Sequence, residues 1–241
     1  MALNKTKVIT VTSVKGGSGK STLTLSLAAA FSKKKLKTII LDLDLTSGVI
    51  APSLNINPEE DIYSLVDDMM NGRFKQIEKY IRNYNEYIDI IPTLTDPRNA
   101  NKIPAQYIEN IIRQLEYKYD IILIDTSNQT SNTNLAAFDN TDIMLYVING
   151  DLMELKNMKT MISIYKDMDL DKYKIILNQS LNKGMDKYEI ENVLERQIDY
   201  IIKKDFYEPN IQKYIYEGKI FSLEKSKKLS IINGLIDEII K

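Results

Sequence analysis

The sequence predicts an α/β fold, namely a doubly wound, mainly parallel sheet with helices on both faces. Short apolar runs rich in β-branched residues, typical of buried strands, alternate with helical segments along all 241 residues. Repeated alternation favours a parallel sheet, because each return to a parallel strand needs a crossover helix. No linker, internal repeat or low-complexity segment divides the chain, so we expect residues 1–241 to form a single domain.

The predicted elements follow from these runs in chain order. The strands are expected at 8–12, 38–43, 87–91, 119–124, 142–148, 173–177 and 200–202. The helices are expected at 21–32, 61–70, 74–82, 103–117, 152–168 and 186–196, with further helices over most of 209–241. Ligands of such sheets bind at the carboxyl ends of the strands, so polar residues that end a strand become the candidates for function.

Composition narrows the chemistry. The formal net charge of −1 gives no overall attraction to nucleic acid or to an anionic membrane. The chain has no cysteine, which excludes disulfides and thiolate metal sites, and no histidine, which removes the usual general base. Catalysis would therefore depend on carboxylates, lysines, backbone dipoles and a bound cation. No signal peptide or transmembrane run is present, so we expect a cytoplasmic protein.

The last segment, 230–241, is amphipathic, because its apolar pairs recur every four residues. Its polar face carries Asp237 and Glu238, which an anionic bilayer would repel. We therefore expect this segment to pack on the protein core rather than on a membrane.

The strongest functional signal is the glycine-rich segment between the first strand and the first helix. Its glycines let the backbone turn tightly and point N–H groups inward, and the helix start adds positive charge, which makes an anion site. Lys20 would reach the β- and γ-phosphates of ATP, and the Ser21 hydroxyl would ligate Mg²⁺. The predicted nucleotide-binding residues are Lys15, Gly16, Gly17, Ser18, Gly19, Lys20, Ser21 and Thr22.

This loop carries a second lysine, Lys15, at its front. The stretch from Gly16 to Ser21 is too short for the ordinary G-x-x-x-x-G-K-[ST] pattern, so the loop is the deviant, two-lysine form. A cation supplied across an interface can stabilise charge on a transferring phosphoryl group, which is worth roughly 10³ to 10⁵ in rate.

Polar residues end three further strands. Asp42 and Asp44 close the second strand and point to the same side, where they would serve a hydrated Mg²⁺ and an attacking water. Asp125 ends an apolar strand in the Walker B arrangement and would help to hold Mg²⁺, usually through water. Asn178 ends a later strand, and its amide suits recognition of the adenine edge. The predicted cofactors are therefore ATP and Mg²⁺, with Ser21, Asp42 and Asp125 at the metal.

These four motifs, in this order, resemble the ParA/MinD family of deviant Walker ATPases over nearly the whole chain. The resemblance implies a homodimer that forms face to face with ATP sandwiched between the subunits. It implies that Lys15 crosses to the partner's phosphates, that Asp44 is linked to the hydrolytic water, and that Asp151 contacts the opposite subunit and its nucleotide site. The expected catalytic residues are Lys15, Lys20 and Asp44.

Within that family, three stretches are similar to the CpaE/TadZ branch, which is associated with type IV (Tad) pilus assembly: 41–48, 61–66 and 134–142. This similarity implies protein partners in a localised machine such as a pilus system. Relatives in that branch often carry an N-terminal receiver-like domain, which we do not expect here, because the phosphate loop begins at about residue 14. A second departure is the stretch 125–128, which lacks the proline that many relatives have there, so switching or turnover could differ.

The leading hypothesis is an ATP-driven dimerisation switch that hydrolyses ATP slowly and positions a cellular machine. In this hypothesis, partners recruit the protein to a pole or to a membrane-bound assembly. A DNA-segregating ParA and a division-site MinD remain alternatives of the same chemistry, and DNA binding has weak support from the near-neutral charge. A scaffold that binds ATP without hydrolysing it is an alternative of another class. A bacterial tyrosine kinase lacks the front lysine and carries clustered C-terminal tyrosines, which this chain lacks.

Overall fold

The computed structural model describes residues 5–179 and 185–240. In this part of the chain one eight-stranded sheet has the order β3-β4-β2-β5-β1-β6-β7-β8. Neighbouring strands are parallel except for β3, which runs antiparallel to β4. The strands are β1 (Lys7–Thr12), β2 (Thr38–Leu43), β3 (Arg82–Asn83), β4 (Ile88–Ile91), β5 (Ile121–Thr126), β6 (Ile143–Ile148), β7 (Tyr173–Asn178) and β8 (Tyr200–Ile202). The predicted doubly wound α/β fold is confirmed.

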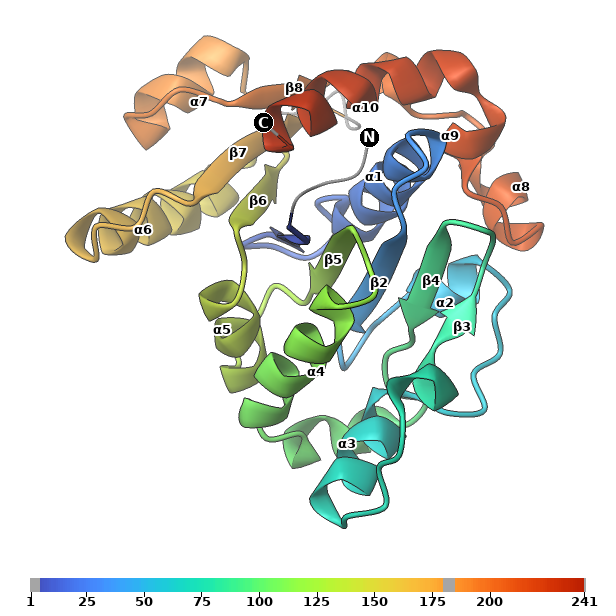
Figure 1. The fold of residues 1–241 in the computed structure, drawn as a ribbon. Coiled ribbons are helices and arrows are strands. Elements are labelled where there is room, and N and C mark those ends of the chain that lie inside the picture. The colour runs from blue at the N-terminus through green and yellow to red at the C-terminus, as the bar shows by residue number, and fades with distance from the viewer. Residues whose placement is uncertain (1–4, 180–184, 241) are drawn as a thin grey trace.

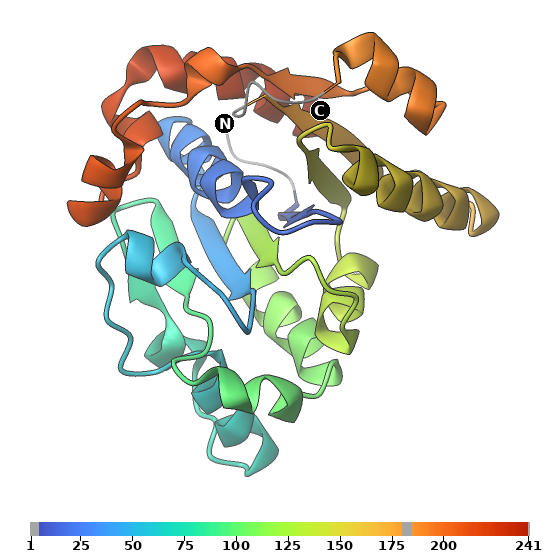
Figure 2. The same cartoon turned by 180° about the vertical axis from the view of Figure 1, so that it is seen from behind.

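Helices cover both faces of this sheet, with α3, α4 and α5 on one side and α1, α9 and α10 on the other (Figures 1 and 2). The α-helices are α1 (Lys20–Lys33), α2 (Ile50–Ser53), α3 (Ile62–Met70), α4 (Gln106–Glu116), α5 (Asn132–Asp139), α6 (Leu152–Asp167), α7 (Lys187–Leu194), α8 (Ile211–Tyr216), α9 (Phe221–Glu224) and α10 (Ser226–Ile239). Three 3₁₀ turns complete the described elements: η1 (Ile77–Tyr80), η2 (Pro97–Lys102) and η3 (Lys204–Phe206).

The alternation of side chains along the strands divides the core between these two layers. Along β5, Leu123 joins the apolar cluster under α1 and α10, whereas Ile122 and Ile124 join the cluster under α3 and α4. Along β6, Leu145 belongs to the first cluster, and Tyr146 packs with α6 and α7. Strands buried on both faces in this way need apolar residues at nearly every position, which is why they were evident in the sequence.

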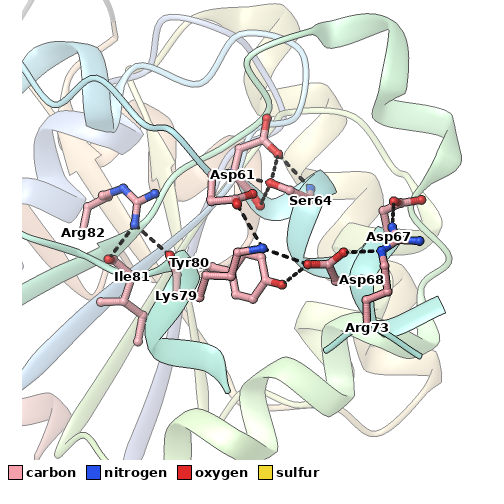
Figure 3. A network of polar contacts seen from close by, with 10 residues as sticks. Asp61, Ser64, Asp67, Asp68, Arg73, Lys79, Tyr80, Ile81 and Arg82 are labelled. Carbon is pink, nitrogen blue, oxygen red and sulfur yellow. Dashed lines mark hydrogen bonds and ion pairs between the residues drawn. The ribbon is translucent and has the colours of Figure 1, made fainter. Parts of the chain in front are cut away.

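The segment between α3 and β4 differs from the predicted helix at 74–82. Only Ile77–Tyr80 forms a 3₁₀ turn, and Arg82 and Asn83 pair with β4 as the antiparallel edge strand. The reason is a polar network that draws the segment back onto α3 (Figure 3). The carboxylate of Asp68 accepts hydrogen bonds from Arg73 Nε at 2.8 Å, Lys79 Nζ at 3.0 Å and the Tyr80 hydroxyl at 2.5 Å. These contacts with Asp68, together with the pairing to β4, outweigh the helical spacing of the apolar residues.

The C-terminal helix α10 packs on the core, as expected. Its apolar positions are buried against α1 and neighbouring strands: Leu229, Ile232, Leu235, Ile236 and Ile239. Asp237, on its polar face, forms an ion pair with Lys34 at 2.8 Å. Across residues 5–179 and 185–240, no helix combines the length and the apolar character needed to cross a bilayer.

Candidate functional site

The loop between β1 and α1 has a backbone that requires glycine. Gly17 and Gly19 have φ angles of 77° and 96°, in the left-handed region that side chains with a Cβ rarely adopt. A Cβ on Gly19 would also lie 2.4 Å from Nδ2 of Asn178, at the end of β7. The loop therefore turns tightly over β7, and any larger residue at position 19 would displace the amide below it.

Asn178 lies buried under this loop, and its Nδ2 donates to the carbonyl oxygen of Ser18 at 2.7 Å. The amide thus holds the loop from below, a role that its strand-end position did not suggest. Recognition of the adenine edge by Asn178 stays a prediction. The hydroxyl of Ser18 is buried and has no hydrogen-bond partner within the described part of the chain. A buried donor of this kind suits a ligand oxygen entering the loop.

Lys20, the first residue of α1, is buried at 7% exposure beneath the loop. Its Nζ donates to Ser13 Oγ at 3.1 Å, and Ser13 Oγ in turn donates to the carbonyl oxygen of Lys15 at 2.6 Å. Ser13 therefore links the buried lysine to the front of the loop. No motif identifies Ser13 in the sequence, because its role depends on how the loop folds back.

The carboxylates of Asp42 and Asp125 converge beside this lysine. The two residues are partners in the register of the parallel strands β2 and β5, and neither is exposed. Asp125 accepts hydrogen bonds from Ser21 Oγ at 2.6 Å and from Thr24 Oγ1 at 3.1 Å. Thr24 was not predicted, although its place one helical turn after Ser21 puts both hydroxyls on the same face of α1.

Burial makes this pair electrostatically unfavourable in the free chain. It raises the pKa of Asp125 to about 6, despite the hydrogen bond from Ser21 and the charge of Lys20. Burial, and next the charge of Asp125, raises the pKa of Asp42 well above its usual range. Two such carboxylates and a serine hydroxyl form an all-oxygen donor set, which suits Mg²⁺. In residues 5–179 and 185–240 no group of three acidic side chains could hold a metal alone, so phosphate and water oxygens would complete its shell.

Asp44 follows directly after β2 at the edge of the same site. Its Oδ1 accepts hydrogen bonds from Ser47 N at 3.0 Å and from Thr46 Oγ1 at 3.3 Å, so the carboxylate is held in a turn. The backbone N–H of Asp44 donates to Oδ1 of Asp42 at 3.1 Å, which places Asp44 next to the buried pair. The structure thus brings Asp42, Asp44 and Asp125 together, as predicted from the strand ends.

Lys15 lies at the exposed front of the loop. Its Nζ is 3.4 Å from Oδ1 of Asp151, and the two side chains are 51% and 45% exposed. Asp151 is the N-cap of α6, where the same Oδ1 accepts hydrogen bonds from Met153 N at 3.1 Å and Glu154 N at 3.2 Å. Within one chain, therefore, Lys15 pairs with Asp151; the contact of Asp151 with an opposite subunit stays a prediction.

A buried carboxylate that the sequence did not suggest supports the start of α6. Glu154 is 1% exposed, and its Oε2 accepts hydrogen bonds from Asn149 N at 2.6 Å and Gly150 N at 3.1 Å. Burial raises its pKa. Because Glu154 holds the turn before Asp151, it fixes the position of the carboxylate that Lys15 contacts.

Two hollows flank the phosphate loop. One, of about 380 Å³, opens beside Ser21 and Thr22 and is walled by α2 and by Ile211 and Tyr214 of α8. The other, of about 560 Å³, lies between α5 and α6 and reaches the loop at Ser13. The first adjoins the first turn of α1 at Ser21 and Thr22.

Known proteins resemble this chain in sequence and in fold. Residues 6–183 match the family model described as AAA domain. The septum site-determining protein MinD of Buchnera aphidicola is 27% identical over 161 residues, 66% of this chain and 58% of that protein. The chain therefore spans a little over half the length of this curated relative.

Solved structures share the fold over nearly the whole chain. A ParA family ATPase from Chlorobium tepidum superposes with a TM-score of 0.83 at 19% identity, covering 95% of this chain and 98% of its own. MinD from Pyrococcus horikoshii, complexed with Mg-ADP, superposes with a TM-score of 0.79 at 23% identity, covering 97% and 96%. The chain belongs to the AAA domain family and has the fold of the ParA/MinD-type P-loop ATPases.

Proposed function

We propose that this protein is an ATP-binding, slowly ATP-hydrolysing dimerisation switch that positions a cellular machine. The observation that carries the proposal is the convergence of a two-lysine phosphate loop with Asp42, Asp44 and Asp125 at the carboxyl ends of β1, β2 and β5. In this arrangement one lysine, Lys20, is buried beneath the loop and the other, Lys15, is exposed at its front.

The loop residues 15–22 would hold the phosphates of ATP, with Lys20 at the β- and γ-phosphates. Ser21, Asp42 and Asp125 would hold Mg²⁺, directly or through water. A bound magnesium ion would neutralise charge that develops on the phosphoryl oxygens. Asp44, held in its turn beside the buried pair, would orient the attacking water. Support for this cofactor set comes from the buried carboxylates and from the Mg-ADP complex of the similar MinD structure.

The hollow beside Thr22 supports a place for the nucleoside. It adjoins the first turn of α1, and its walls are mainly apolar, with Tyr214 able to contact a planar base. We propose that the base half of ATP lies between Asn178 and this hollow.

Lys15 would act between two copies of the chain. Its ion pair with Asp151 is half exposed, and such pairs contribute little to stability, so the ammonium can leave for a stronger partner. A triphosphate on a facing subunit is such a partner. We propose that ATP joins two chains face to face through this contact, and that hydrolysis releases them.

The finer assignment is a CpaE/TadZ-like role in pilus assembly or localisation, in the cytoplasm, with protein partners of that machine. It rests on the similarity of segments 41–48, 61–66 and 134–142 alone. DNA partitioning of the ParA type and division-site positioning of the MinD type use the same switch and remain the alternatives.

The test is the mass of the protein by light scattering in Mg-ATP and in Mg-ADP. We expect ATP to convert monomer to dimer, Asp44→Ala to trap the dimer by blocking hydrolysis, and Lys15→Ala to abolish it. Lys159→Ala is the matched control, because Lys159 is similarly exposed and forms an ion pair with Glu195 at 2.6 Å, away from the loop. A mass that is indifferent to nucleotide would overturn the switch and favour a constitutive scaffold.

A further inference from the structure

The loop that follows Asp125 is tied down by one buried side chain. Asn134, in the first turn of α5, is 0% exposed. Its Nδ2 donates to the carbonyl oxygen of Gln129 at 2.7 Å and to Oγ of Ser127 at 3.0 Å, with the Ser127 carbonyl oxygen at 3.5 Å. The two carbonyl acceptors fix the orientation of the amide, since only its nitrogen can donate to them. The segment 127–129 is therefore anchored to α5.

This loop faces the phosphate loop. Thr126, just before it, donates from Oγ1 to the carbonyl oxygen of Val11 in β1 at 3.1 Å. Asn128 lies between the two anchored residues, and its Oδ1 would be 4.0 Å from a Cβ on Gly16. The anchors at Thr126, Ser127 and Gln129 leave Asn128 as the residue presented to the front of the phosphate loop.

Helix capping does not account for the Asn134 side chain. Ser131 is the N-cap of α5, and its Oγ accepts the backbone N–H of Asn134 at 3.1 Å. The Oδ1 of Asn134 is buried without a hydrogen-bond partner in the described residues, which carries a desolvation cost. The side-chain nitrogen of Asn134 donates to Ser127 and Gln129, both in the loop, so the amide serves the loop rather than the helix.

We propose that Asn134 is a positioning residue for ATP turnover, which acts by holding the loop 127–129 against the phosphate loop. This inference rests on the proposed ATPase function. Groups already in place at the reacting phosphate need no reorganisation during the chemical step. Asn134 lies outside the phosphate loop itself, so it affects the rate of hydrolysis and leaves nucleotide affinity unchanged.

The test compares Asn134→Ala with Asn140→Ala. Asn140 is the matched control, because its Nδ2 also donates to a carbonyl oxygen, that of Ala136 at 2.8 Å, at the other end of α5. We expect Asn134→Ala to lower kcat about tenfold and to change KM for ATP less than about twofold. The change in Tm should be small, because Gln129 is exposed and Ser127 is half-buried, so water can replace the lost donor. Asn140→Ala should keep the wild-type kcat.

A second variant keeps the test valid if Asn134→Ala does not fold. Asn128→Ala changes an exposed side chain and should fold, and we expect it to lower kcat too. Combined with Asn134→Ala it should give no further loss, since both act through one loop, whereas independent effects would add. Additive effects, an unchanged kcat in Asn128→Ala, or a loss confined to KM would overturn the inference. If the wild type does not hydrolyse ATP, the proposed function is overturned as well. If the wild type is active and Asn134→Ala has the same kcat, the inference alone is overturned.

Discussion

The ammonium of Lys15 lies 3.4 Å from the carboxylate of Asp151, and both belong to the same chain. The contact joins the front of the phosphate loop to the N-cap of α6, which Glu154 holds from inside. Because both partners are about half exposed, the ion pair adds little to stability. The loop and α6 are thus connected by a contact that a competing anion can replace at low cost.

Asp151→Asn removes the ion pair with Lys15 but keeps a side chain that can cap α6. Asparagine caps helices as well as aspartate does, so we expect Tm to change by less than about 2 °C. Without its partner in the same chain, Lys15 should be available to a second subunit, and ATP-dependent dimers should form at the same or an up to about twofold lower protein concentration. Thermal melts and light scattering over a concentration series measure both. A dimer weakened about tenfold would instead support the contact of Asp151 with the opposite subunit that the family resemblance implies.

Asp125→Asn should stabilise the free protein and remove its response to nucleotide. The pKa of Asp125 is raised to about 6 from a usual value of 3.8, so its ionised form destabilises the free fold. This cost is absent below about pH 4, grows as pH rises towards 6 and is fully present at pH 7.5. Removing it should raise stability at pH 7.5 by about 1–3 kcal/mol. The increase in Tm that Mg-ATP gives the wild type should disappear.

Thermal denaturation at pH 5 and pH 7.5 tests this account, with Asp171→Asn as a control at an exposed carboxylate. The gain in Tm should be larger at pH 7.5 than at pH 5. A loss of stability at pH 7.5 would show that the hydrogen bonds from Ser21 and Thr24 outweigh the cost of the buried charge.

Gly19→Ala should abolish ATP binding, whereas Gly72→Ala should not affect it. Both glycines have positive φ angles, 96° and 66°, so both variants carry similar backbone strain, about 1–2 kcal/mol. A Cβ at position 72 meets nothing within 4 Å, but one at position 19 would lie 2.4 Å from Asn178 Nδ2 and would deform the loop. Titration with a fluorescent ATP analogue distinguishes the two. Equal affinities would mean that Asn178 moves aside without disturbing the loop.

Asp68→Asn should lower stability at neutral pH. The ionised carboxylate of Asp68 stabilises the fold, whereas that of Asp125 destabilises it. Hydrogen bonds from the Tyr80 hydroxyl, Lys79 and Arg73 hold the pKa of Asp68 well below its usual value (Figure 3). A lowered pKa stabilises the fold above about pH 4, and this contribution is lost as pH falls further. Wild type should therefore melt above Asp68→Asn at pH 7, and the gap should shrink at pH 3. A constant gap would show that packing, not charge, is responsible.

The buried strands were the most predictable part of the fold, because their own residues specify them. Strands β2 and β5 are apolar at nearly every buried position, and their ends bring Asp42 and Asp125 to one edge. The prediction of a helix at 74–82 was wrong. The apolar spacing of this segment suits a helix, but its structure depends on contacts with Asp68 and on pairing with β4. Helix α5 is short and begins with polar residues, so its pattern is weak.

The supporting residues of the site were less predictable for a related reason. Ser13 and Glu154 bind atoms that reach them only after the loops fold back, and serine or glutamate alone carries no motif. The sequence marks Asn134 only as part of a segment similar to one family branch. Its amide donates to a main-chain carbonyl oxygen, which every residue has, so no residue pattern indicates this role. Such roles depend on loop geometry rather than on residue pattern.

The sheet has very short edge strands. β3 has two residues and β8 has three, so neither offers another chain a long row of free backbone groups. Growth of the sheet by addition of a foreign strand, the route to aggregates, is therefore disfavoured at both ends. If two copies associate, side chains rather than paired strand edges would make the contact, so single substitutions could strengthen or abolish it while the sheet stays intact.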